Sequence, residues 1–319
     1  MRCAVLKGVG SYLPARIVTN DALSEIMETS DEWIRRRTGI RERRIAAEQE
    51  LTSDLAVHAA QQALEKADIG PEAVDLVLVA TVTPDRTFPS TATLVQERLG
   101  IQGMAFDLSA ACSGFLYALT VADTLLKQGQ ATGALVIGAE TFSRLLDWSD
   151  RTTAPLFGDG AGAVFLRAEE RSESTGLLAS RLHADGRQWD LLYTDGGPSL
   201  NQKAGVVRMQ GREIFRHAVE KMIASVQEIL ALSEMTLDDI AWIIPHQANI
   251  RIIEAMAEKL FFPMERVLVT VGHHANTSAA SIPLSLAEGF AQNQLLPGQN
   301  LLLTAIGAGL TWGASLLRL

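Results

Sequence analysis

The chain repeats one strand-and-helix pattern, and this repeat limits its possible folds more than any other feature. Residues 75–80 (Asp-Leu-Val-Leu-Val-Ala) resemble residues 239–244 (Asp-Ile-Ala-Trp-Ile-Ile), and subtracting 75 from 239 gives an offset of 164 positions. The same offset carries Cys112 onto Asn276, and each of these residues opens a helix-like segment rich in Ala and Ser. Because unrelated α/β units also look alike, the strand pattern alone leaves duplication open. The two matching junctions favour a duplicated fold that brings Cys112 and Asn276 to one shared site.

The rest of the chain alternates short, apolar, β-rich runs with longer helix-like segments, which is the pattern of an α/β protein. Strands are expected over residues 76–80, 134–137, 163–166, 242–244, 267–271 and 301–303. Helices are expected over residues 54–67, 112–127, 212–232, 250–260 and 278–292. The longest uncharged stretch, residues 295–317, contains one proline and four glycines, so it predicts two buried strands around a glycine turn rather than a membrane span.

The composition indicates a compact globular protein. Of the 319 residues, 47% are hydrophobic and 20% are charged, and there is no long low-complexity tract. The N-terminal residues lack the apolar run of a secretory signal, and the two cysteines are too few for a disulfide framework and lack metal-ligand spacing. We therefore expect a protein of the reducing cytoplasm. The formal charge of −9 argues against general nucleic-acid binding and would repel an acidic partner, unless a local basic patch overrides it.

Cys112 is the first candidate for chemistry. It lies in the stretch Phe-Asp-Leu-Ser-Ala-Ala-Cys-Ser-Gly-Phe, residues 106–115, which turns through small residues into a helix. At a helix N-terminus the unpaired N–H groups and the positive end of the dipole favour the thiolate, which is the nucleophilic form of cysteine. A lone cysteine can also be a buried, inert core residue, which is how we interpret Cys3 in the first apolar strand.

Two neutral hydrogen-bonding residues complete the candidate site. His246 directly follows the strand expected at residues 242–244, and sites in α/β folds tend to lie at such strand ends. Asn276 precedes the helix expected at residues 278–292, where its amide can point out of the scaffold. Taken singly, His246 could be a core histidine and Asn276 a helix N-cap. Together with Cys112 they form a much more specific Cys-His-Asn constellation.

These residues lie in segments that resemble the β-ketoacyl-[acyl-carrier-protein] synthase III family, and the resemblance covers essentially the whole chain. Besides the segments around Cys112, His246 and Asn276, it includes residues 10–14, 29–34, 37–43, 88–90, 157–162 and 311–313. It implies an α/β fold of the thiolase-like, five-layered αβαβα type, built from two duplicated halves. Residues 1–170 would carry the nucleophilic cysteine, and residues 171–319 would carry the histidine and the asparagine.

The resemblance implies a ping-pong acyltransferase that initiates fatty acid biosynthesis. Cys112 would take an acyl group from acyl-CoA, and the carbanion formed when malonyl-[acyl-carrier-protein] loses CO2 would attack it to give a 3-oxoacyl-[acyl-carrier-protein]. Neutral His246 and Asn276 would donate hydrogen bonds to the enolate, so no metal or other cofactor is expected, and coenzyme A enters only as the thioester substrate. The oxyanion hole would combine backbone N–H groups of Cys112 and of the turn at Ala308, where the family usually has glycine.

The resemblance also implies where coenzyme A and a second subunit bind. Trp33 and Arg151 match the pair that sandwiches the adenine, and Arg37 matches a phosphate contact. Further matches on the CoA side are Thr29, Phe215 and Asn249. From the residues alone, Trp33 is equally consistent with ordinary packing, and the arginines at 35–37 with a solvated helix end. Phe88 matches a residue that closes the acyl pocket of a partner subunit, which implies a homodimer.

A basic surface for the acidic carrier protein is expected on two helices. Arg208, Arg212 and Arg216 recur at intervals of four, so at least the last two should share a helix face. The expected landing site consists of Arg212, Arg216, Arg251 and Lys259. Glu258 stands where the family commonly has a lysine, which would weaken docking.

Three alternatives also fit the sequence. A relative in specialised metabolism would use longer or branched acyl primers, or would transfer the acyl group without decarboxylation. A catalytically silent, carrier-binding subunit is less consistent, because its mark would be loss of the nucleophile and Cys112 is present. A cysteine hydrolase with a Cys-His-Asn triad is disfavoured by the missing secretory signal and by the carrier-type basic helix.

Overall fold

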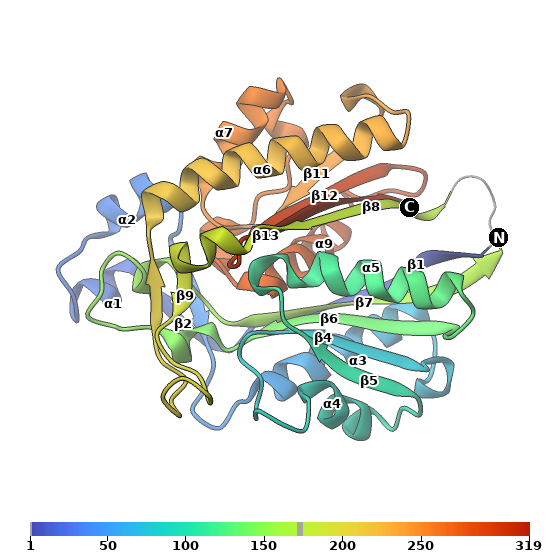
Figure 1. The fold of residues 1–319 in the computed structure, drawn as a ribbon, viewed down its shortest axis with the longest axis horizontal. Coiled ribbons are helices and arrows are strands. Elements are labelled where there is room, and N and C mark those ends of the chain that lie inside the picture. The colour runs from blue at the N-terminus through green and yellow to red at the C-terminus, as the bar shows by residue number, and fades with distance from the viewer. Residues whose placement is uncertain (1, 171–174) are drawn as a thin grey trace.

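Two β-sheets alternate with three layers of helices in the computed structural model, which describes residues 2–170 and 175–319 (Figure 1). The outer face of the first sheet is covered by α3 (Thr52–Ala67) and α4 (Thr91–Leu99). Between the sheets lie α5 (Gly114–Lys127) and α9 (Ser281–Ala291), and the outer face of the second sheet is covered by α6 (Gly211–Leu232) and α7 (Ile250–Leu260). The expected five-layered αβαβα fold is confirmed.

The two sheets have the same core arrangement of strands. The strands are β1 (Arg2–Tyr12), β4 (Leu76–Ala80), β5 (Met104–Leu108), β6 (Gly133–Glu140), β7 (Gly160–Glu170), β8 (Gly176–Ala184), β11 (Trp242–Pro245), β12 (Asn300–Gly307) and β13 (Thr311–Arg318). The first sheet has the order β1-β7-β6-β4-β5 and the second the order β11-β12-β13-β8. β4 is parallel to β6, as β11 is to β12, while β6–β7 and β12–β13 are antiparallel. The repeat seen in the sequence is therefore a repeat of structure.

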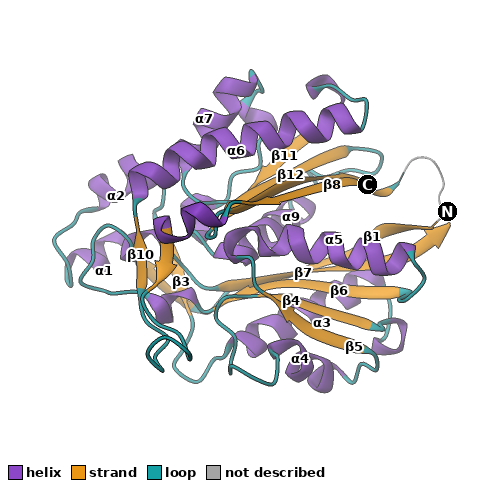
Figure 2. Cartoon of the chain, viewed as in Figure 1, coloured by secondary structure: helices purple, strands orange, loops and turns teal. Residues whose placement is uncertain are grey.

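Shorter elements surround these layers (Figure 2). They are α1 (Asn20–Ser24), α2 (Asp31–Thr38), α8 (Val271–His274), the pair β2 (Arg16–Thr19) and β3 (Glu42–Ile45), and the pair β9 (Leu192–Thr194) and β10 (Val207–Met209). The uncharged stretch at residues 295–317 contains β12 and most of β13, as predicted. Cys3 is buried in β1, as expected of a core residue. None of the described helices combines the length and the apolar character needed to cross a membrane.

One predicted strand, at residues 267–271, is wrong. Only its first residue forms a bridge to β11. The cause is the buried side chain of Gln247, whose Nε2 donates to the carbonyl of Leu268 at 3.0 Å while its Oε1 accepts from the N–H of Thr270 at 2.8 Å. A side chain thus takes the backbone groups that a neighbouring strand would pair with. The other predicted strands lie within observed ones, and the predicted helices match observed ones within a few residues.

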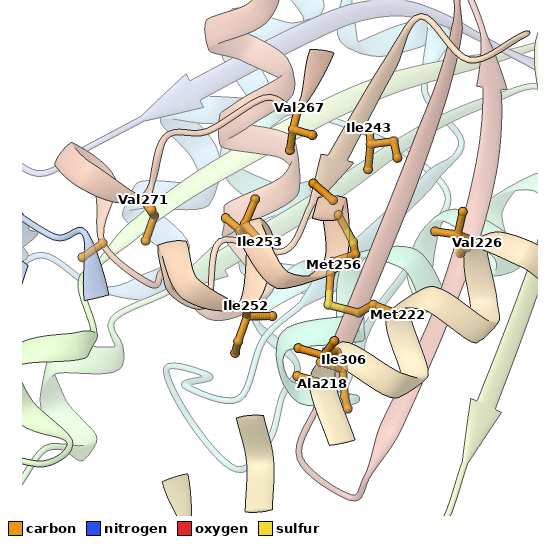
Figure 3. Close-up of a cluster of buried hydrophobic side chains, with 14 of the residues drawn as sticks. Ala218, Met222, Val226, Ile243, Ile252, Ile253, Met256, Val267, Val271 and Ile306 are labelled. Atoms are coloured by element: carbon orange, nitrogen blue, oxygen red, sulfur yellow. The ribbon is translucent and has the colours of Figure 1, made fainter. Parts of the chain in front are cut away.

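Apolar side chains from α6, α7 and the second sheet fill one core of the protein (Figure 3). Met222 and Val226 of α6, Ile253 and Met256 of α7 and Ile243 of β11 belong to this one cluster, and all five are buried. The three- and four-residue spacing of these positions places them on one face of each helix. This packing fixes the start of α7, which follows directly on the segment that contains His246.

The helical segment that follows Asn276 lies directly on the backbone of the first sheet. It begins with a short 3₁₀ helix, η8 (Ser278–Ala280), and continues into α9. A Cβ atom at Gly138 would lie 2.3 Å from the carbonyl oxygen of Ala279, and one at Gly162 would lie 2.6 Å from the N atom of Leu284. Both strands therefore need glycine at these positions, because no side chain fits between sheet and helix.

Candidate active site

Cys112 lies on the turn between β5 and α5. The chain passes through the 3₁₀ helix η2 (Ala111–Ser113), in which Ala111 has a φ of +46°. This left-handed conformation is unfavourable for a residue with a Cβ atom, so contacts around the turn must hold it. One such contact joins the two halves of the chain, since the Oγ of Ser113 lies 2.8 Å from the Oγ1 of Thr311. The turn presents Cys112 next to the second half of the chain.

His246 follows β11, as expected, and its imidazole is buried. Its Nδ1 lies 2.7 Å from the Oγ of Ser281, the first residue of α9. The same oxygen accepts a hydrogen bond from the backbone N–H of Gln247 at 3.3 Å, so the Ser281 proton is free to point at Nδ1. In that arrangement Nδ1 accepts and Nε2 carries the proton. Burial lowers the pKa of His246 to about 3, so the imidazole is a neutral donor.

Asn276 is held by backbone hydrogen bonds on both sides. Its N–H donates to the carbonyl of Leu156 at 2.9 Å, and its carbonyl accepts from the N–H of Gly158 at 3.0 Å. Its side-chain Oδ1 accepts from the N–H of Ser278 at 2.9 Å. Because the side-chain oxygen is engaged by the turn before α9, the Nδ2 group is left to donate elsewhere. The hydrogen bond to Ser278 agrees with the interpretation of Asn276 as a residue at a helix start, whereas its role as a hydrogen-bond donor in catalysis stays a prediction.

The three residues line one cavity of about 1170 Å³. They reach it from the turn before α5, the end of β11 and the turn before α9. Their exposed fractions are 6% for Cys112, 2% for His246 and 7% for Asn276. The convergence expected from the repeat is therefore present, and it occurs in a place largely closed to water.

Burial opposes the thiolate that the helix start was expected to favour. Burial is the main reason why the pKa of Cys112 is raised to about 12. The charge of the nearby Glu140 also raises this pKa, while a hydrogen bond with the Ser278 hydroxyl lowers it. A helix terminus contributes roughly 0.3–1 kcal/mol, which is less than one pKa unit. Desolvation of a fully buried group can shift a pKa by several units. The expected preference for thiolate is therefore wrong for the resting site, where Cys112 is a thiol.

Glu140, the last residue of β6, is an ionisable residue that the sequence analysis missed. It is fully buried, and its carboxylate accepts hydrogen bonds from the Oγ1 of Thr83 at 2.7 Å and from the N–H of Val82 at 3.1 Å. Burial raises its pKa to about 7 against these hydrogen bonds, which lower it. A charged residue at the C-terminal end of an apolar strand is a signal that could have revealed it.

Most of the residues expected to bind coenzyme A line the same cavity as Cys112: Trp33, Arg37, Arg151, Phe215 and Asn249. The Cζ atoms of Arg37 and Arg151 lie 4.5 and 5.8 Å from the centre of the Trp33 ring, so two guanidinium groups stand near one indole. Thr29 does not line this cavity, and its hydroxyl oxygen is buried without a hydrogen-bond partner among the described residues.

A second cavity, of about 650 Å³, is also lined by Cys112 and includes Ala308 and Phe106 in its wall. Phe88 does not line it; 82% of this residue is exposed. The turn at Ala308 tolerates alanine because the positive φ of this turn, 134°, falls on Gly309 and not on Ala308. The replacement of the usual glycine therefore creates no backbone strain at position 308.

The basic residues expected to bind a carrier protein fall into two groups. Arg212 and Arg251 line the main cavity, whereas Arg216 and Lys259 are exposed outside it. Arg216 is paired with an acidic residue of its own helix at 2.6 Å. Arg208 lies in β10 and not on α6, so the four-residue spacing does not extend along the helix to it.

Comparison with known proteins identifies the family. Residues 106–186 match the family model for 3-oxoacyl-[acyl-carrier-protein] synthase III, and residues 230–319 match the model for its C-terminal part. A β-ketoacyl-[acyl-carrier-protein] synthase III of Paramagnetospirillum magneticum is 59% identical over 98% of both chains. The chain belongs to the β-ketoacyl-[acyl-carrier-protein] synthase III family.

Solved structures of the synthase III family have the same fold. The crystal structure of 3-oxoacyl-[acyl-carrier-protein] synthase III from Aquifex aeolicus is 47% identical and superposes with a TM-score of 0.93, covering 99% of this chain and 100% of that one. The priming β-ketosynthase of the R1128 polyketide pathway is 33% identical, with a TM-score of 0.92 over 99% of this chain and 97% of its own.

One group of side chains in the described part of this synthase III family member has the composition of a metal site. Ligand-type atoms of His273, His274 and Glu288 lie within 4.8 Å of one another. Both imidazoles approach the same Glu288 oxygen, at 2.8 and 3.3 Å, and none of the three residues lines the cavity that contains Cys112. The group links α8 to α9, on either side of Asn276 in the chain. That catalysis needs no metal stays a prediction.

Proposed function

We propose that the chain catalyses the first condensation of fatty acid biosynthesis. It transfers an acyl group from acyl-CoA to Cys112, and then joins this group to the carbanion formed by decarboxylation of malonyl-[acyl-carrier-protein]. The products are CoA, CO2 and a 3-oxoacyl-[acyl-carrier-protein]. The observation that supports this most is that Cys112, His246 and Asn276 line one buried cavity in a chain of the synthase III family.

In the first half-reaction the sulfur of Cys112 attacks the thioester carbonyl. The sulfur–carbon bond to Cys112 forms, the bond to CoA breaks, and the thiol proton ends on the departing CoA, so no net proton is released. Because burial raises the pKa of the thiol to about 12, the proton leaves as the new bond forms rather than beforehand. We assign the oxyanion to the backbone N–H groups of Cys112 and Ala308.

In the second half-reaction the carbon–carbon bond to the malonyl carboxylate breaks and its electron pair moves toward the thioester oxygen. The resulting carbanion forms a bond to the acyl carbon, the bond from that carbon to the sulfur of Cys112 breaks, and one proton from solvent restores the thiol. We assign the Nε2–H of His246 and the Nδ2–H of Asn276 as the donors that stabilise this enolate. Ser281 supports this role, because its proton directed at Nδ1 leaves the His246 proton on Nε2. A preorganised donor of this kind is typically worth about 2.7–4 kcal/mol of barrier.

The mouth of the main cavity is the proposed binding site for coenzyme A. Trp33, Arg37 and Arg151 are assigned to the nucleotide, with Thr29, Phe215 and Asn249 on the CoA side. Stacking of guanidinium groups near an indole supports this assignment, because both kinds of plane stack on a purine.

The acidic carrier protein is proposed to dock on Arg212, Arg216, Arg251 and Lys259. We expect Arg251→Glu to slow the malonyl-carrier step at least several times more than acyl loading from CoA, since surface charge acts mainly on the association of the carrier. Equal slowing of both half-reactions would contradict this assignment.

A homodimer is proposed from the first sheet. β5 is an edge strand of that sheet, and Phe106 on it is 37% exposed. An unpaired edge strand with an exposed aromatic residue is suited to pairing with a second copy. Phe88 of the partner subunit would then close the 650 Å³ cavity, which we propose as the acyl pocket.

The remaining assignments follow from this reaction. No cofactor is needed, because the thioester substrates supply both the acyl group and the leaving groups. Residues 1–170 and 171–319 are taken as the two halves of the catalytic unit. We place the enzyme in the cytoplasm, in contact with neither nucleic acid nor membrane, since its substrates are a coenzyme A thioester and a carrier protein.

Intact-mass measurement tests the proposal directly. The protein is exposed to a panel of acyl-CoA thioesters, and malonyl-[acyl-carrier-protein] is then added while CO2 is collected. We expect one acyl adduct, followed by its loss together with CO2 release and 3-oxoacyl-carrier formation. The variant Cys112→Ser should gain no adduct at the normal rate; if it does, the nucleophile is another residue. Release of the free acid instead of condensation would indicate a hydrolase.

Specialised metabolism is the second candidate. It is supported by the 33% identity to the priming β-ketosynthase of a polyketide pathway, whose fold is shared. The same acyl-CoA panel separates the two, because a primer-specialised enzyme would load a longer or branched acyl group faster than a short one.

A further inference from the structure

A cleft lined by arginines lies beside the mouth of the main cavity. It has a volume of about 430 Å³, and its charged lining residues are Arg35, Arg36 and Arg41. Its apolar lining residues include Ile250 and Val269. We call it the arginine cleft. None of its lining residues, all in the described part of the chain, is acidic.

The arginine cleft is an exception to the charge of the protein. The chain has 37 acidic and 28 basic residues, so exposed arginines have many possible partners. Arg35 is paired with Asp31 at 3.3 Å, but Arg36 and Arg41 have no carboxylate oxygen within 4.0 Å among the described residues, and all three arginines are exposed. Apolar walls behind unpaired charges lower the local dielectric and strengthen their attraction for an anion.

The arginine cleft is continuous with the surface around Arg251. Arg36 lines both the cleft and the main cavity. The end of α2 is packed tightly on the first residue of α7, since a Cβ atom at Gly39 would lie 2.7 Å from the Cβ atom of Ile250. Arg251 is the next residue of α7 and lines the mouth of the main cavity. The positive surface thus runs from the start of α7 to the C-terminal end of α2, whose last turn is basic and whose first turn carries Asp31 and Glu32.

Along α7 itself the positive surface is interrupted. The exposed residues that follow Arg251 on this helix include Glu254 and Glu258 before Lys259 is reached. An acidic partner that approaches Arg251 would therefore be repelled along α7 and attracted toward α2.

We propose that the arginine cleft is the second half of the docking surface for malonyl-[acyl-carrier-protein], and that it binds carboxylates of the carrier while Arg251 contacts the same partner at the cavity mouth. This inference rests on the proposed function, which supplies the acidic carrier as the partner. It deepens that function by extending the docking surface from α7 to the junction of α2 and α7, and by giving the arginine cleft more weight than the far end of α7.

Charge reversal at Arg41 tests the inference, because Arg41 lines the arginine cleft but not the main cavity. For Arg41→Glu we expect kcat/KM with malonyl-[acyl-carrier-protein] to fall about three- to tenfold, as one exposed attraction becomes a repulsion. The loss should shrink at high salt. Lys259→Glu should lose less than Arg41→Glu. The matched control is Lys66→Glu, an exposed lysine of α3 beneath the first sheet, which should lose nothing (Figure 1).

Carrier-free substrates separate the possible outcomes. Acyl loading from acyl-CoA and condensation with malonyl-pantetheine should proceed at wild-type rates in Arg41→Glu, and normal loading also shows that the variant is folded. Arg35→Glu is the second variant and should behave in the same way. The inference is overturned if Arg41→Glu equals the Lys66→Glu control, or if it weakens the use of acyl-CoA or malonyl-pantetheine as much as that of the carrier. If the wild-type chain condenses no malonyl substrate at all, the proposed function itself fails.

Discussion

Replacing Ser281 with alanine should slow decarboxylation without slowing acyl loading. Ser281 Oγ lies 2.7 Å from Nδ1 of His246 and accepts from the N–H of Gln247, which leaves its proton for Nδ1. Without this hydroxyl, Nδ1 no longer has a donor that keeps the imidazole proton on Nε2. The proton can then reside on Nδ1, and in that tautomer Nε2 cannot donate to the enolate.

The size of the effect follows from one lost hydrogen bond. A neutral hydrogen bond has a net worth of about 0.5–1.5 kcal/mol, so the preference for the Nε2–H form should weaken by up to about tenfold. Removing the donor completely, as in His246→Ala, should cost about 2.7–4 kcal/mol, or two to three orders of magnitude in rate. Ser281→Ala should therefore lie between the wild-type protein and His246→Ala.

Two measurements check this prediction. CO2 release from malonyl thioester by the acyl-enzyme reports decarboxylation, and the rate of acyl adduct formation reports loading. Ser285→Ala is the matched control, because it removes a buried hydroxyl one turn further along α9 that does not contact His246. Nitrogen NMR of the imidazole reads the tautomer directly. Equal slowing of both half-reactions, or a wild-type spectrum with the proton on Nδ1, would refute the reasoning.

Two further predictions concern the scaffold around the site. Glu140 has a pKa of about 7 in the fold against an ordinary value of 4.5, so its contribution to stability is present below about pH 4.5 and is lost as the pH rises through 7. Across this range the free energy of unfolding of the wild-type protein should fall by about 3 kcal/mol relative to that of Glu140→Gln, as measured by denaturant titrations. Parallel pH profiles of the two proteins would contradict this prediction. Gly138→Ala should destabilise the protein by about 1–3 kcal/mol and slow decarboxylation, because the new Cβ atom would meet the carbonyl of Ala279. The control is Gly186→Ala, where a Cβ atom meets nothing within 4 Å. Equal stability of the two variants would show that the sheet and the helix can separate freely.

The sequence predicted the parts of the structure that depend on strand ends and on the repeat. His246 could be placed because an apolar run ends just before it, and Cys112 and Asn276 because the same offset relates their segments. The observed sheets repeat the same strand arrangement, so a simple comparison of the two halves identified residues that meet in space. These features are local in sequence, or equivalent by duplication.

What the sequence could not predict depends on side chains that replace or oppose local structure. Residues 267–271 look like a strand, but Gln247 takes their backbone hydrogen bonds. Arg208 continues the spacing of Arg212, yet the chain leaves the helix before reaching it. Each of these outcomes depends on contacts between segments that are distant in the sequence, and the periodicity of a single segment does not reveal such contacts.

Burial of the site also separates it from a cysteine hydrolase of the Cys-His type. Such hydrolases use a thiolate paired with an imidazolium, which requires a lowered cysteine pKa and a charged histidine. Here the same desolvation raises the pKa of Cys112 to about 12 and lowers that of His246 to about 3, so both residues are neutral at rest. A neutral histidine cannot form an ion pair with a preformed thiolate. It can donate its N–H hydrogen bond to an enolate without any change in its own charge. The pH profile of decarboxylation should consequently show no inflection from His246 between pH 5 and 8, and an inflection that disappears in His246→Ala would show that the imidazole titrates and that the donor is charged.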